Sequence, residues 1–559
     1  MSELVSIAEL DLTPASGKEY WSCDREGREE FIYFLMVDRF HDSLDRLPVS
    51  TPERSKGSGA PERLKKFCGG TIRGIHDHLD YIQGLGCTAL WLSPVFENND
   101  DSYHGYAIQN YLDIDRRFGD KRDLSELVDG AHSRNMRVFL DVVLNHSGDN
   151  WAYPGDIRCY YNNDEQFEFG YWRREDRPVP VELRDPALYH RRGEIRNFDA
   201  YPEAERGDFF RLKDFNNDEC EDGRRLQDIL IKIHCYWLRE LDVDGFRVGS
   251  VKNMGERAVA QFCSALYEYS YMLGKRGFFL FGELVGGDDA INRYLGPNTP
   301  TRADSKTPYY GLTSVLDYPL YRVLPEVIKG LESPASLMAR YGDLRSGPFS
   351  HGELARYLVT FIDNHDQIDQ SYKLRFAADS YDEQVIAGMG YLLCALGTPC
   401  IYYGTEQGFS GQGKGDIYIR EAMFDMADSE KNYLNPNCMI YRAISEIARV
   451  RREVKALRFG EMYFRKISGN GHDFGFPWGQ PCTLAFSRIL AGKEILVAYN
   501  TSTTEARQDY VIVDSQISRS RMRFLYGTEG EVPVQDHHDG SRSVRLDLGP
   551  MKFVILQSV

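Results

Sequence analysis

Three things that the sequence lacks exclude broad classes of protein. Nowhere do about 18 apolar residues follow one another, so we expect no membrane span. The first twenty residues contain no basic stretch followed by an apolar one, which argues against a secretory signal. The eleven cysteines include no Cys-x-x-Cys pair, which argues against a structural zinc site or a disulfide framework. Together these absences favour a cytoplasmic protein.

Basic residues are also fewer than acidic ones. The chain carries 84 acidic residues against 67 basic ones, a formal net charge of −17, so we expect no nucleic acid as a partner. Hydrophobic residues make up 42% and charged residues 27%, which is ordinary for a folded globular chain. Aromatic residues are plentiful at 13%, and their flat faces pack in cores and also stack on sugar rings.

Up to about residue 456, short apolar runs rich in β-forming residues alternate with longer amphipathic stretches. This alternation is typical of parallel strands joined by crossover helices. The candidate strands are Phe31–Phe40, Thr88–Val95, Arg137–Asn145, Asp244–Val248, Phe278–Leu284, Ser314–Asp317, Leu358–Asn364 and Cys400–Glu406. The helical patterns between them include Ile72–Leu85, Asp123–Arg134, Leu226–Leu241, Glu256–Leu273 and Glu383–Leu396. Eight such strands predict an α/β fold, a closed (β/α)8 barrel of the TIM type.

Two segments depart from this alternation. Residues 146–212 are too long for a simple loop and predict a small domain inserted after the third strand. After about residue 457 short alternating runs replace the helical pattern, which predicts a C-terminal all-β sandwich over 457–559. The barrel itself is then formed by residues 1–145 and 213–456.

Side chains suited to catalysis gather where several candidate strands end, which is where barrel enzymes place their reactive groups. These ends carry Tyr103-His104-Gly105-Tyr106 after the second strand, Asp141 to His146 at the third, Arg247 and Gly249 on the fourth, Glu283 at the fifth and Asn364-His365-Asp366 at the seventh. Carboxylates, histidines and an arginine are therefore predicted to converge on one barrel mouth.

In this order the segments resemble the signature regions of the α-amylase family, glycoside hydrolase family 13. The resemblance spans roughly residues 31–456 and includes Gly86–Val95, Leu212–Asn216 and Gly397–Glu406. It implies a retaining hydrolase or transglycosylase acting on α-linked gluco-oligosaccharides, with no organic cofactor. In such an enzyme one carboxylate attacks the anomeric carbon while a second carboxyl group protonates the leaving oxygen.

The resemblance implies a role for each of these side chains. Glu283 would be the acid/base, and Asp366 the carboxylate that holds the hydroxyls of the donor sugar. Arg247 would orient and ionise the nucleophile, because position 249 lies on the same strand face. The other residues implied to contact sugar are His104, Tyr106, His146 and His365 around the donor ring and Lys252 on the acceptor side.

The nucleophile itself is missing, because the family pattern places an aspartate where this chain has Gly249. Every other member of the set is present, which favours a deliberately inactivated enzyme. A natural, non-catalytic glucan-binding protein of the same fold is the alternative. We also expect the glycine to leave a small polar hole beside Arg247, large enough for a water or a small anion.

The residues after position 249 indicate which glycosidic linkage the protein acts on. Ser250 and Lys252 resemble the hydroxyl-x-lysine pattern of family branches that act on α-1,4 bonds. Branches that prefer α-1,6 bonds tend to carry an aliphatic residue directly after the nucleophile. The pattern therefore favours α-1,4 substrates, with hydrolysis and transfer both open.

The resemblance also implies a calcium ion that bridges the barrel and the insertion. Asn145 and Asp214 match family positions that ligate it, with the backbone carbonyl of Asn253 as a third ligand. Hard oxygen donors of this type suit calcium. Position 253 is, however, usually a histidine in calcium-binding members, and several branches of the family lack the ion.

Overall fold

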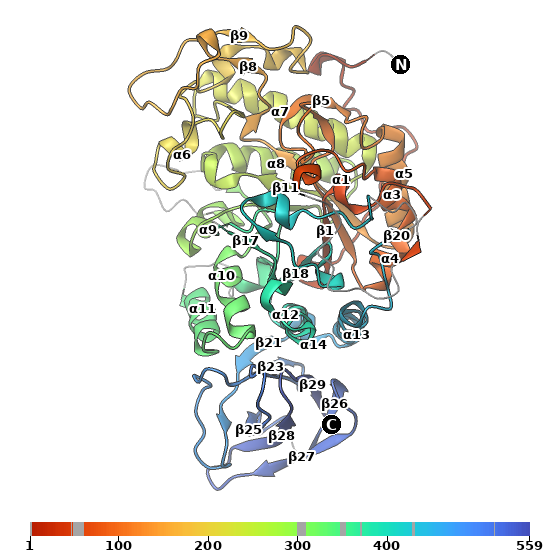
Figure 1. Ribbon diagram of the computed structural model, residues 1–559, viewed down its shortest axis with the longest axis vertical. Helices are drawn as coiled ribbons and strands as arrows, with labels where there is room; N and C mark the ends of the chain where they lie inside the picture. Colours follow the sequence, from red (N-terminus) through yellow and green to blue (C-terminus); the bar gives the residue numbers. More distant parts are fainter. Residues whose placement is uncertain are drawn as a thin grey trace.

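The computed structural model describes residues 3–45, 47–48, 61–298, 309–346, 354–368, 370, 372–426, 431–518 and 520–559. It shows a strand-and-helix barrel in the middle of the molecule (Figure 1). A mostly irregular insertion lies above the barrel in this view, near the N-terminus, and a strand-only module lies below it. All eleven cysteines lie in the described residues and are free.

The central sheet has eight parallel strands. They are β1 (Ile32–Leu35), β3 (Ala89–Leu92), β6 (Arg137–Val143), β11 (Gly245–Gly249), β12 (Phe279–Gly282), β15 (Ser314–Val315), β16 (Val359–Thr360) and β18 (Thr398–Tyr402). Their order is β15-β12-β11-β6-β3-β1-β18-β16, and a parallel bridge between Leu316 and Val359 joins the two outer strands. The predicted (β/α)8 barrel is therefore confirmed, with its sixth strand reduced to two residues.

Aromatic side chains fill part of the barrel interior. Phe34 of β1 stacks on Trp91 of β3 with ring centroids 3.7 Å apart, and Phe281 of β12 meets Trp91 edge-on at 5.3 Å. Phe139 of β6 packs against Phe281 as well. Large flat rings from neighbouring strands thus close the barrel beneath its mouth, which leaves the polar groups at the strand ends facing outwards from a packed core.

The crossover helices follow the predicted pattern closely. They include α3 (Ile72–Asp77), α4 (Leu79–Gly84), α5 (Lys121–Ser133), α7 (Glu221–Leu241), α8 (Glu256–Met272), α10 (Tyr318–Ile328), α12 (Asp382–Cys394) and α13 (Met439–Glu453). The single helix expected over residues 72–85 is divided at His78, whose backbone leaves the helical region. Helix α5 begins where Asp120 and Asp123 form a capping box. Within the described residues, no helix has the length and apolar character needed to span a membrane.

The insertion has little regular structure. Its strands β7 (His146–Ser147) and β10 (Lys213–Asp214) pair with each other in antiparallel fashion, and β8 (Trp151–Ala152) pairs with β9 (Tyr171–Trp172). The pairing of β7 with β10 joins the start of the insertion to its end. This pair extends to residue 214, so the two ends of the segment are tied together directly above β6.

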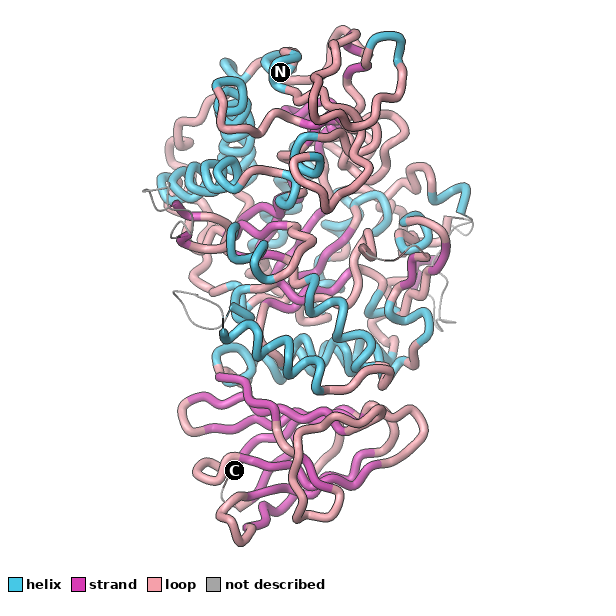
Figure 2. The backbone as a smooth tube through the Cα atoms, turned by 90° about the vertical axis from the view of Figure 1, so that its left-hand side faces the viewer, coloured by secondary structure: helices cyan, strands magenta, loops and turns pink. Residues whose placement is uncertain are grey.

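The C-terminal module consists of nine antiparallel strands. They are β21 (Glu461–Phe464), β22 (Ile467–Ser468), β23 (Thr483–Leu490), β24 (Lys493–Asn500), β25 (Arg507–Val513), β26 (Arg521–Tyr526), β27 (Glu531–Asp536), β28 (Arg542–Leu548) and β29 (Phe553–Ser558). In Figure 2 they form a separate body of strands below the helices. In the described residues they form one sheet in the order β21-β23-β24-β29-β26-β27-β28-β25-β22, with a hydrophobic core that includes Leu496, Val511 and Val544.

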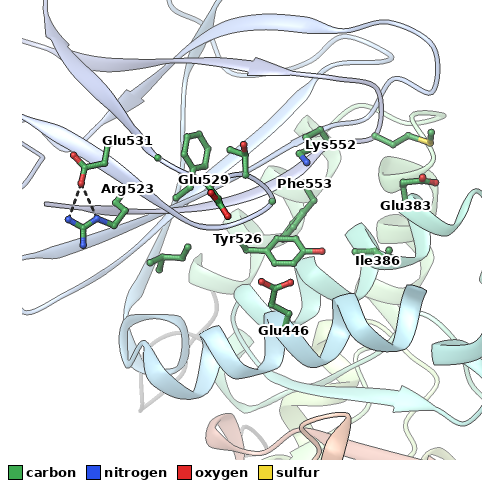
Figure 3. A pocket seen from close by; sticks show the side chains of 15 residues that line it. Glu383, Ile386, Glu446, Arg523, Tyr526, Glu529, Glu531, Lys552 and Phe553 are labelled. Atoms are coloured by element: carbon green, nitrogen blue, oxygen red, sulfur yellow. Dashed lines mark hydrogen bonds and ion pairs between the residues drawn. The ribbon is translucent and has the colours of Figure 1, made fainter. Parts of the chain in front are cut away.

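Arg488 of β23 ties this module to the barrel. Its buried guanidinium donates hydrogen bonds to the backbone carbonyls of Cys394 and Ala395 after α12, and to those of Leu457 and Gly460. Burial without a carboxylate partner lowers the pKa of this arginine to about 9. Elsewhere along the boundary a pocket of about 690 Å³ opens between the module and α12 and α13, with Glu446 facing Tyr526 (Figure 3).

We expect Arg488→Met to destabilise the protein by about 2 kcal/mol, because it leaves several buried carbonyls without a donor. Arg545, whose side chain is 46% exposed, provides the control, and Arg545→Met should change stability by less than about 0.5 kcal/mol. Thermal unfolding of the three proteins measures the difference. Equal unfolding midpoints for the two variants would contradict the proposed anchoring.

Candidate functional site

Four of the predicted residues lie side by side at the carboxyl ends of adjacent strands: Asp141 of β6, Arg247 and Gly249 of β11, and Glu283 directly after β12. Strand β11 pairs with β6 so that Arg247 lies opposite Asp141, and with β12 so that Val248 lies opposite Gly282, the residue before Glu283. Parallel pairing in this register brings a carboxylate from each neighbouring strand towards the arginine.

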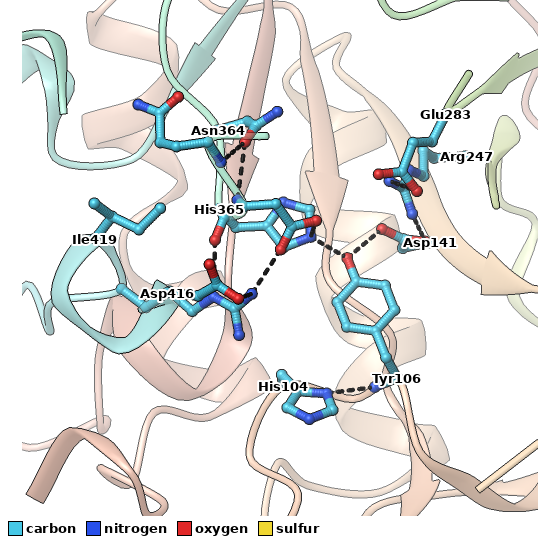
Figure 4. A network of polar contacts seen from close by, with 12 residues as sticks. His104, Tyr106, Asp141, Arg247, Glu283, Asn364, His365, Asp416 and Ile419 are labelled. Atoms are coloured by element: carbon cyan, nitrogen blue, oxygen red, sulfur yellow. Dashed lines mark hydrogen bonds and ion pairs between the residues drawn. The ribbon is translucent and has the colours of Figure 1, made fainter. Parts of the chain in front are cut away.

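The guanidinium of Arg247 forms the centre of this group. Its Nη1 lies 3.0 Å from Asp141 Oδ1, and its Nη2 lies 2.8 Å from Glu283 Oε2. Figure 4 shows the arginine between these two carboxyl groups. Only 1% of the Arg247 side chain is exposed, so both ion pairs lie in an environment of low polarity where they are strong.

Gly249 lies directly beside this arginine. A Cβ atom built on Gly249 would stand 2.4 Å from Arg247 Nη1 and 3.6 Å from Glu283 Oε2. The expected hole beside Arg247 is therefore wrong, because the guanidinium occupies the space that a side chain at position 249 would use. The atom in the way is the far end of a flexible side chain, so the space can be reopened at low cost.

Tyr106 connects the arginine group to the residues after β16. Its hydroxyl donates to Asp141 Oδ2 at 2.8 Å and lies 2.9 Å from His365 Nε2, and its ring stacks on the imidazole of His365 (Figure 4). Trp91 Nε1 donates a further hydrogen bond to Asp141. Burial raises the pKa of Asp141 to about 6, although Arg247 favours its charged form. Burial also lowers the pKa of His365 to about 3, which keeps this imidazole neutral.

Asp366 lies on the opposite side of the mouth and is held by Arg420. Arg420 Nη2 donates to Asp366 Oδ1 at 2.6 Å, and its Nε donates to the carbonyl of His365 at 2.8 Å. Burial disfavours the charge on Asp366, but His365 and Arg420 outweigh this effect and hold its pKa below the ordinary value.

Glu283 has the properties of a general acid. Burial raises its pKa above the ordinary value against the effect of Arg247, and the charges of Asp366 and Asp141 add to the rise. The hydroxyl of Tyr318 lies 3.4 Å from its Oε1 and accepts a hydrogen bond from Asn364. A carboxyl group that keeps its proton to higher pH can deliver it to a leaving oxygen.

The remaining predicted contacts lie at the rim. The ring of His104 accepts a hydrogen bond from the backbone of Tyr106, and His146 Nε2 lies 3.3 Å from the Tyr106 carbonyl. Lys252, in contrast, is paired with the exposed Asp199 of the insertion. The roles that the resemblance implies for these side chains stay predictions.

Sequence reasoning missed Arg420 and Tyr318. Tyr318 directly follows the predicted sixth strand, so its position at a strand end was a usable signal. Arg420 follows the glycine-rich loop after β18, and no motif points to it. Only the folded chain brings this loop against Asp366.

Two of the residues expected to hold calcium, Asn145 and Asp214, lie side by side, and the calcium ion stays a prediction. Asn145 Nδ2 donates to Asp214 Oδ1 at 3.3 Å, but the other oxygen of Asp214 lies 2.6 Å from His190 Nδ1. The side chain of Asn253 donates to the carbonyl of Ala204. Calcium takes six to eight oxygen ligands. In the described part of the chain no cluster of three or more His, Cys, Asp or Glu side chains is suited to a metal.

Comparison with known proteins identifies the family. The family model described as alpha amylase, catalytic domain, matches residues 34–440, which covers most of the chain and all of the strand ends above. The chain belongs to the α-amylase family. The resemblance in the signature regions is thereby confirmed, and the barrel with its polar mouth is the catalytic domain of that family.

Two curated relatives of this α-amylase family chain show how far the similarity extends. An α-amylase of Streptomyces lividans is 28% identical over 90% of this chain and 58% of its own length. A cyclomaltodextrin glucanotransferase of Klebsiella oxytoca is 29% identical over 71% of this chain and 62% of its own length. The chain thus spans about three fifths of these two relatives.

Solved structures of the family share the fold. An α-amylase from Geobacillus thermoleovorans, complexed with acarbose, superposes with a TM-score of 0.69 at 23% identity, covering 96% of this chain and 99% of its own. A cyclomaltodextrin glucanotransferase with a three-domain ABC distribution superposes with a TM-score of 0.70 at 24% identity, covering 95% and 99%. Likeness at this identity establishes the architecture alone.

Replacing Arg420 with Met removes the cation that stabilises the Asp366 carboxylate. The depressed pKa of Asp366 contributes stability above its unfolded pKa of about 4, and this contribution is lost as the pH falls through the folded value. We therefore expect the variant to be less stable by about 2 kcal/mol at pH 7 and to approach the wild type only as the pH falls to the folded pKa of Asp366, about 2. Thermal unfolding across this pH range measures the difference.

Arg420→Lys is the matched control, because it keeps the charge but loses the planar fork that reaches both Asp366 and the His365 carbonyl. It should retain part of the stability at pH 7. A difference between Arg420→Met and wild type that does not change with pH would show that Arg420 acts through packing alone.

Proposed function

We propose that this chain binds α-linked gluco-oligosaccharides in the pocket of a retaining glycosidase or transglycosylase whose nucleophile is missing at Gly249. One observation carries the proposal. The Cβ atom of a side chain at position 249 would lie beside Arg247 and 3.6 Å from Glu283 Oε2. A carboxyl group on this Cβ would face that of Glu283, and a retaining mechanism needs two carboxyl groups about 5–5.5 Å apart. The named relatives, an α-amylase and a cyclomaltodextrin glucanotransferase, support the substrate class.

In the completed site each group has a defined part. An aspartate at position 249 attacks the anomeric carbon of the bound sugar while Glu283 protonates the leaving oxygen, and a glycosyl-enzyme results. Glu283 then takes a proton from water or a sugar hydroxyl, which releases the product. Arg247 holds the nucleophile ionised, and Asp366, fixed by Arg420, binds the hydroxyls of the donor ring.

The linkage follows from the residues beside the missing nucleophile. Ser250 and Lys252 retain the pattern of branches that cleave α-1,4 bonds, and we propose α-1,4-linked oligosaccharides as the ligand. Phe209 stacks on His146 at the edge of the mouth, and Phe210 next to it is 65% exposed. Exposed aromatic rings of this kind support the binding of further sugar units.

A second candidate is a non-catalytic glucan-binding protein, in which Gly249 is the natural residue. The ion pairs of Arg247 favour this candidate. Arg247 pairs with Asp141 and Glu283, so the guanidinium has carboxylate partners even when position 249 is a glycine. Both candidates share the ligand. They differ in whether the pocket is still shaped for the chemical step.

We expect Gly249→Asp to raise the hydrolysis or transfer of maltooligosaccharides by at least about 10³-fold over the present chain, because it restores the covalent step. The new carboxylate would also draw Arg247 away from Glu283. Glucose and maltose among the products indicate hydrolysis, whereas longer or cyclic products indicate transfer.

Gly249→Asn has nearly the same size but no nucleophilic charge, and it should stay inactive. Combining Gly249→Asp with Glu283→Gln should abolish the gain, since the acid is then missing. Calorimetric titration with acarbose measures whether the present chain and the variants bind. If Gly249→Asp binds but does not turn over, the non-catalytic candidate holds; if none binds, both are overturned.

A further inference from the structure

A cavity lies at the end of the barrel opposite the mouth. Phe31, Thr88 and Met136 line it, and they directly precede the strands β1, β3 and β6. The cavity is therefore at the amino ends of the strands, whereas the predicted catalytic groups stand at the carboxyl ends. Its volume of about 220 Å³ is below the range of about 300–1,000 Å³ that is usual for drug-sized ligands, so it suits a small molecule or ion.

The lining of this cavity is strongly basic, although the chain as a whole carries a formal net charge of −17. Among the described residues, one carboxylate, Glu29, lines the cavity together with five arginines, namely Arg25, Arg134, Arg451, Arg452 and Arg458. The arginines come from the N-terminal segment, the end of α5, the last turn of α13 and the short helix α14 (Ala456–Phe459). Only the fold brings these positive charges together.

The carboxylates around the cavity do not balance this charge. Three of the five arginines have a carboxylate partner within 3.0 Å, in the pairs Arg458–Glu29, Arg134–Asp80 and Arg25–Glu30. Glu30 also pairs with the buried Arg137, so it is shared between two guanidinium groups. Three carboxylates therefore serve four arginines before the remaining two are counted.

Arg451 and Arg452 carry the positive charge that is left over. Arg451 is only 3% exposed, and its terminal nitrogens donate to the backbone carbonyls of Leu393, Leu457 and Arg28. Burial without a carboxylate partner lowers the pKa of Arg451 to about 10. The side chain of Arg452 is exposed and forms no hydrogen bond or ion pair with any described residue. Carbonyl oxygens carry partial charges only, so two full positive charges lack a counter-charge at this cavity.

Unused hydrogen-bond donors belong to the same arginines. The Nε atoms of Arg451 and Arg458 are buried and have no hydrogen-bond partner among the described residues. A buried donor without an acceptor is unfavourable, and such groups in folded proteins are usually satisfied by water, an ion or a ligand. An anion in the cavity would supply both the acceptors and the missing negative charge.

We propose that this cavity binds a phosphate dianion, either inorganic phosphate or the phosphate group of a small phosphate monoester. At pH 7 such a group carries a charge of about −1.5 to −2, which matches the two arginines without carboxylate partners. Its oxygens are strong acceptors, and the planar fork of a guanidinium binds two of them at once. The inference does not rest on the proposed function, because it concerns the opposite end of the barrel.

Arg452 separates ligand binding from a purely structural role. Arginines near the ends of helices also stabilise a fold by binding the last backbone carbonyls, as Arg134 does at the carbonyl of Gly130. Arg451 does the same at the carbonyls of Leu393 and Leu457. Arg452 lines the cavity but binds no carbonyl of the described chain. Its guanidinium is therefore available to a ligand, and its removal costs the fold little.

The first test uses the unmodified chain. We expect calorimetric titration with sodium phosphate near neutral pH to show saturable binding of about one ion per chain, with a dissociation constant of about 1 mM or tighter. Saturating phosphate should also raise the thermal unfolding midpoint by roughly 1–3 °C over sodium chloride of equal ionic strength, because a ligand of the folded state stabilises it. The absence of saturable heat, or equal midpoints in the two salts, would overturn the proposal.

Glucose 6-phosphate, titrated in the same way, distinguishes the two sources of the phosphate group. Binding at least about tenfold tighter than that of inorganic phosphate assigns the cavity to a phosphorylated sugar, and equal or weaker binding assigns it to the free ion. Maltose lacks a phosphate, so an excess of it should displace neither ligand. Displacement by maltose would place the binding at the mouth and contradict the proposal.

The second test removes one arginine. Arg452→Gln keeps a polar side chain at an exposed position, and we expect it to weaken phosphate binding by at least about tenfold while the unfolding midpoint in sodium chloride stays the same. Arg449→Gln on the same helix is the matched control, because Arg449 pairs with Glu453 and is not among the described residues that line the cavity. It should bind phosphate like the unmodified chain. Unchanged binding in Arg452→Gln, or an equal loss in both variants, would rule out this cavity as the phosphate site.

Discussion

The pairing of the buried Arg247 guanidinium with Asp141 and Glu283 is the constraint on which the mouth of the barrel depends. A buried guanidinium needs acceptors for its N–H groups, and the parallel register of β6, β11 and β12 supplies a carboxylate from each side. Asp141 in turn orients Tyr106, and Tyr106 orients His365. Position 249 is a glycine, and the guanidinium occupies the space that a side chain there would use.

Two outer elements complete the mouth, and each is held by its own buried charge pair. The loop after β18 brings Arg420 to Asp366, and the insertion brings His146 to the rim through the pairing of β7 with β10. At the far end of the barrel, Arg488 of the C-terminal module donates hydrogen bonds to the backbone carbonyls of Cys394 and Leu457. Buried arginines and histidines therefore connect parts of the chain that are far apart in the sequence.

Much of the architecture follows from patterns in the sequence. Barrel strands are buried on both faces and read as continuous apolar runs, so the eight strands were recognisable, although β15 is only two residues long. Strand β27 carries polar and partly exposed residues and gives no such signal. Strand β21 is half exposed and β22 has only two residues, so neither gives a clear pattern in the sequence. The division between α3 and α4 at His78 depends on local backbone geometry that amphipathic periodicity does not reveal.

The sequence by itself determined which residues stand at the strand ends, because strand boundaries and the period of two place side chains such as Arg247 and position 249 on one face. It also shows that position 249, where the family resemblance implies an aspartate, is a glycine. Only the tertiary structure decided which side chains pair with one another. Arg247 fills the space beside Gly249. Arg420 donates to Asp366, and His190 pairs with Asp214. These outcomes depend on contacts between residues distant in the chain, and a long flexible side chain takes whichever buried partner the fold brings within reach.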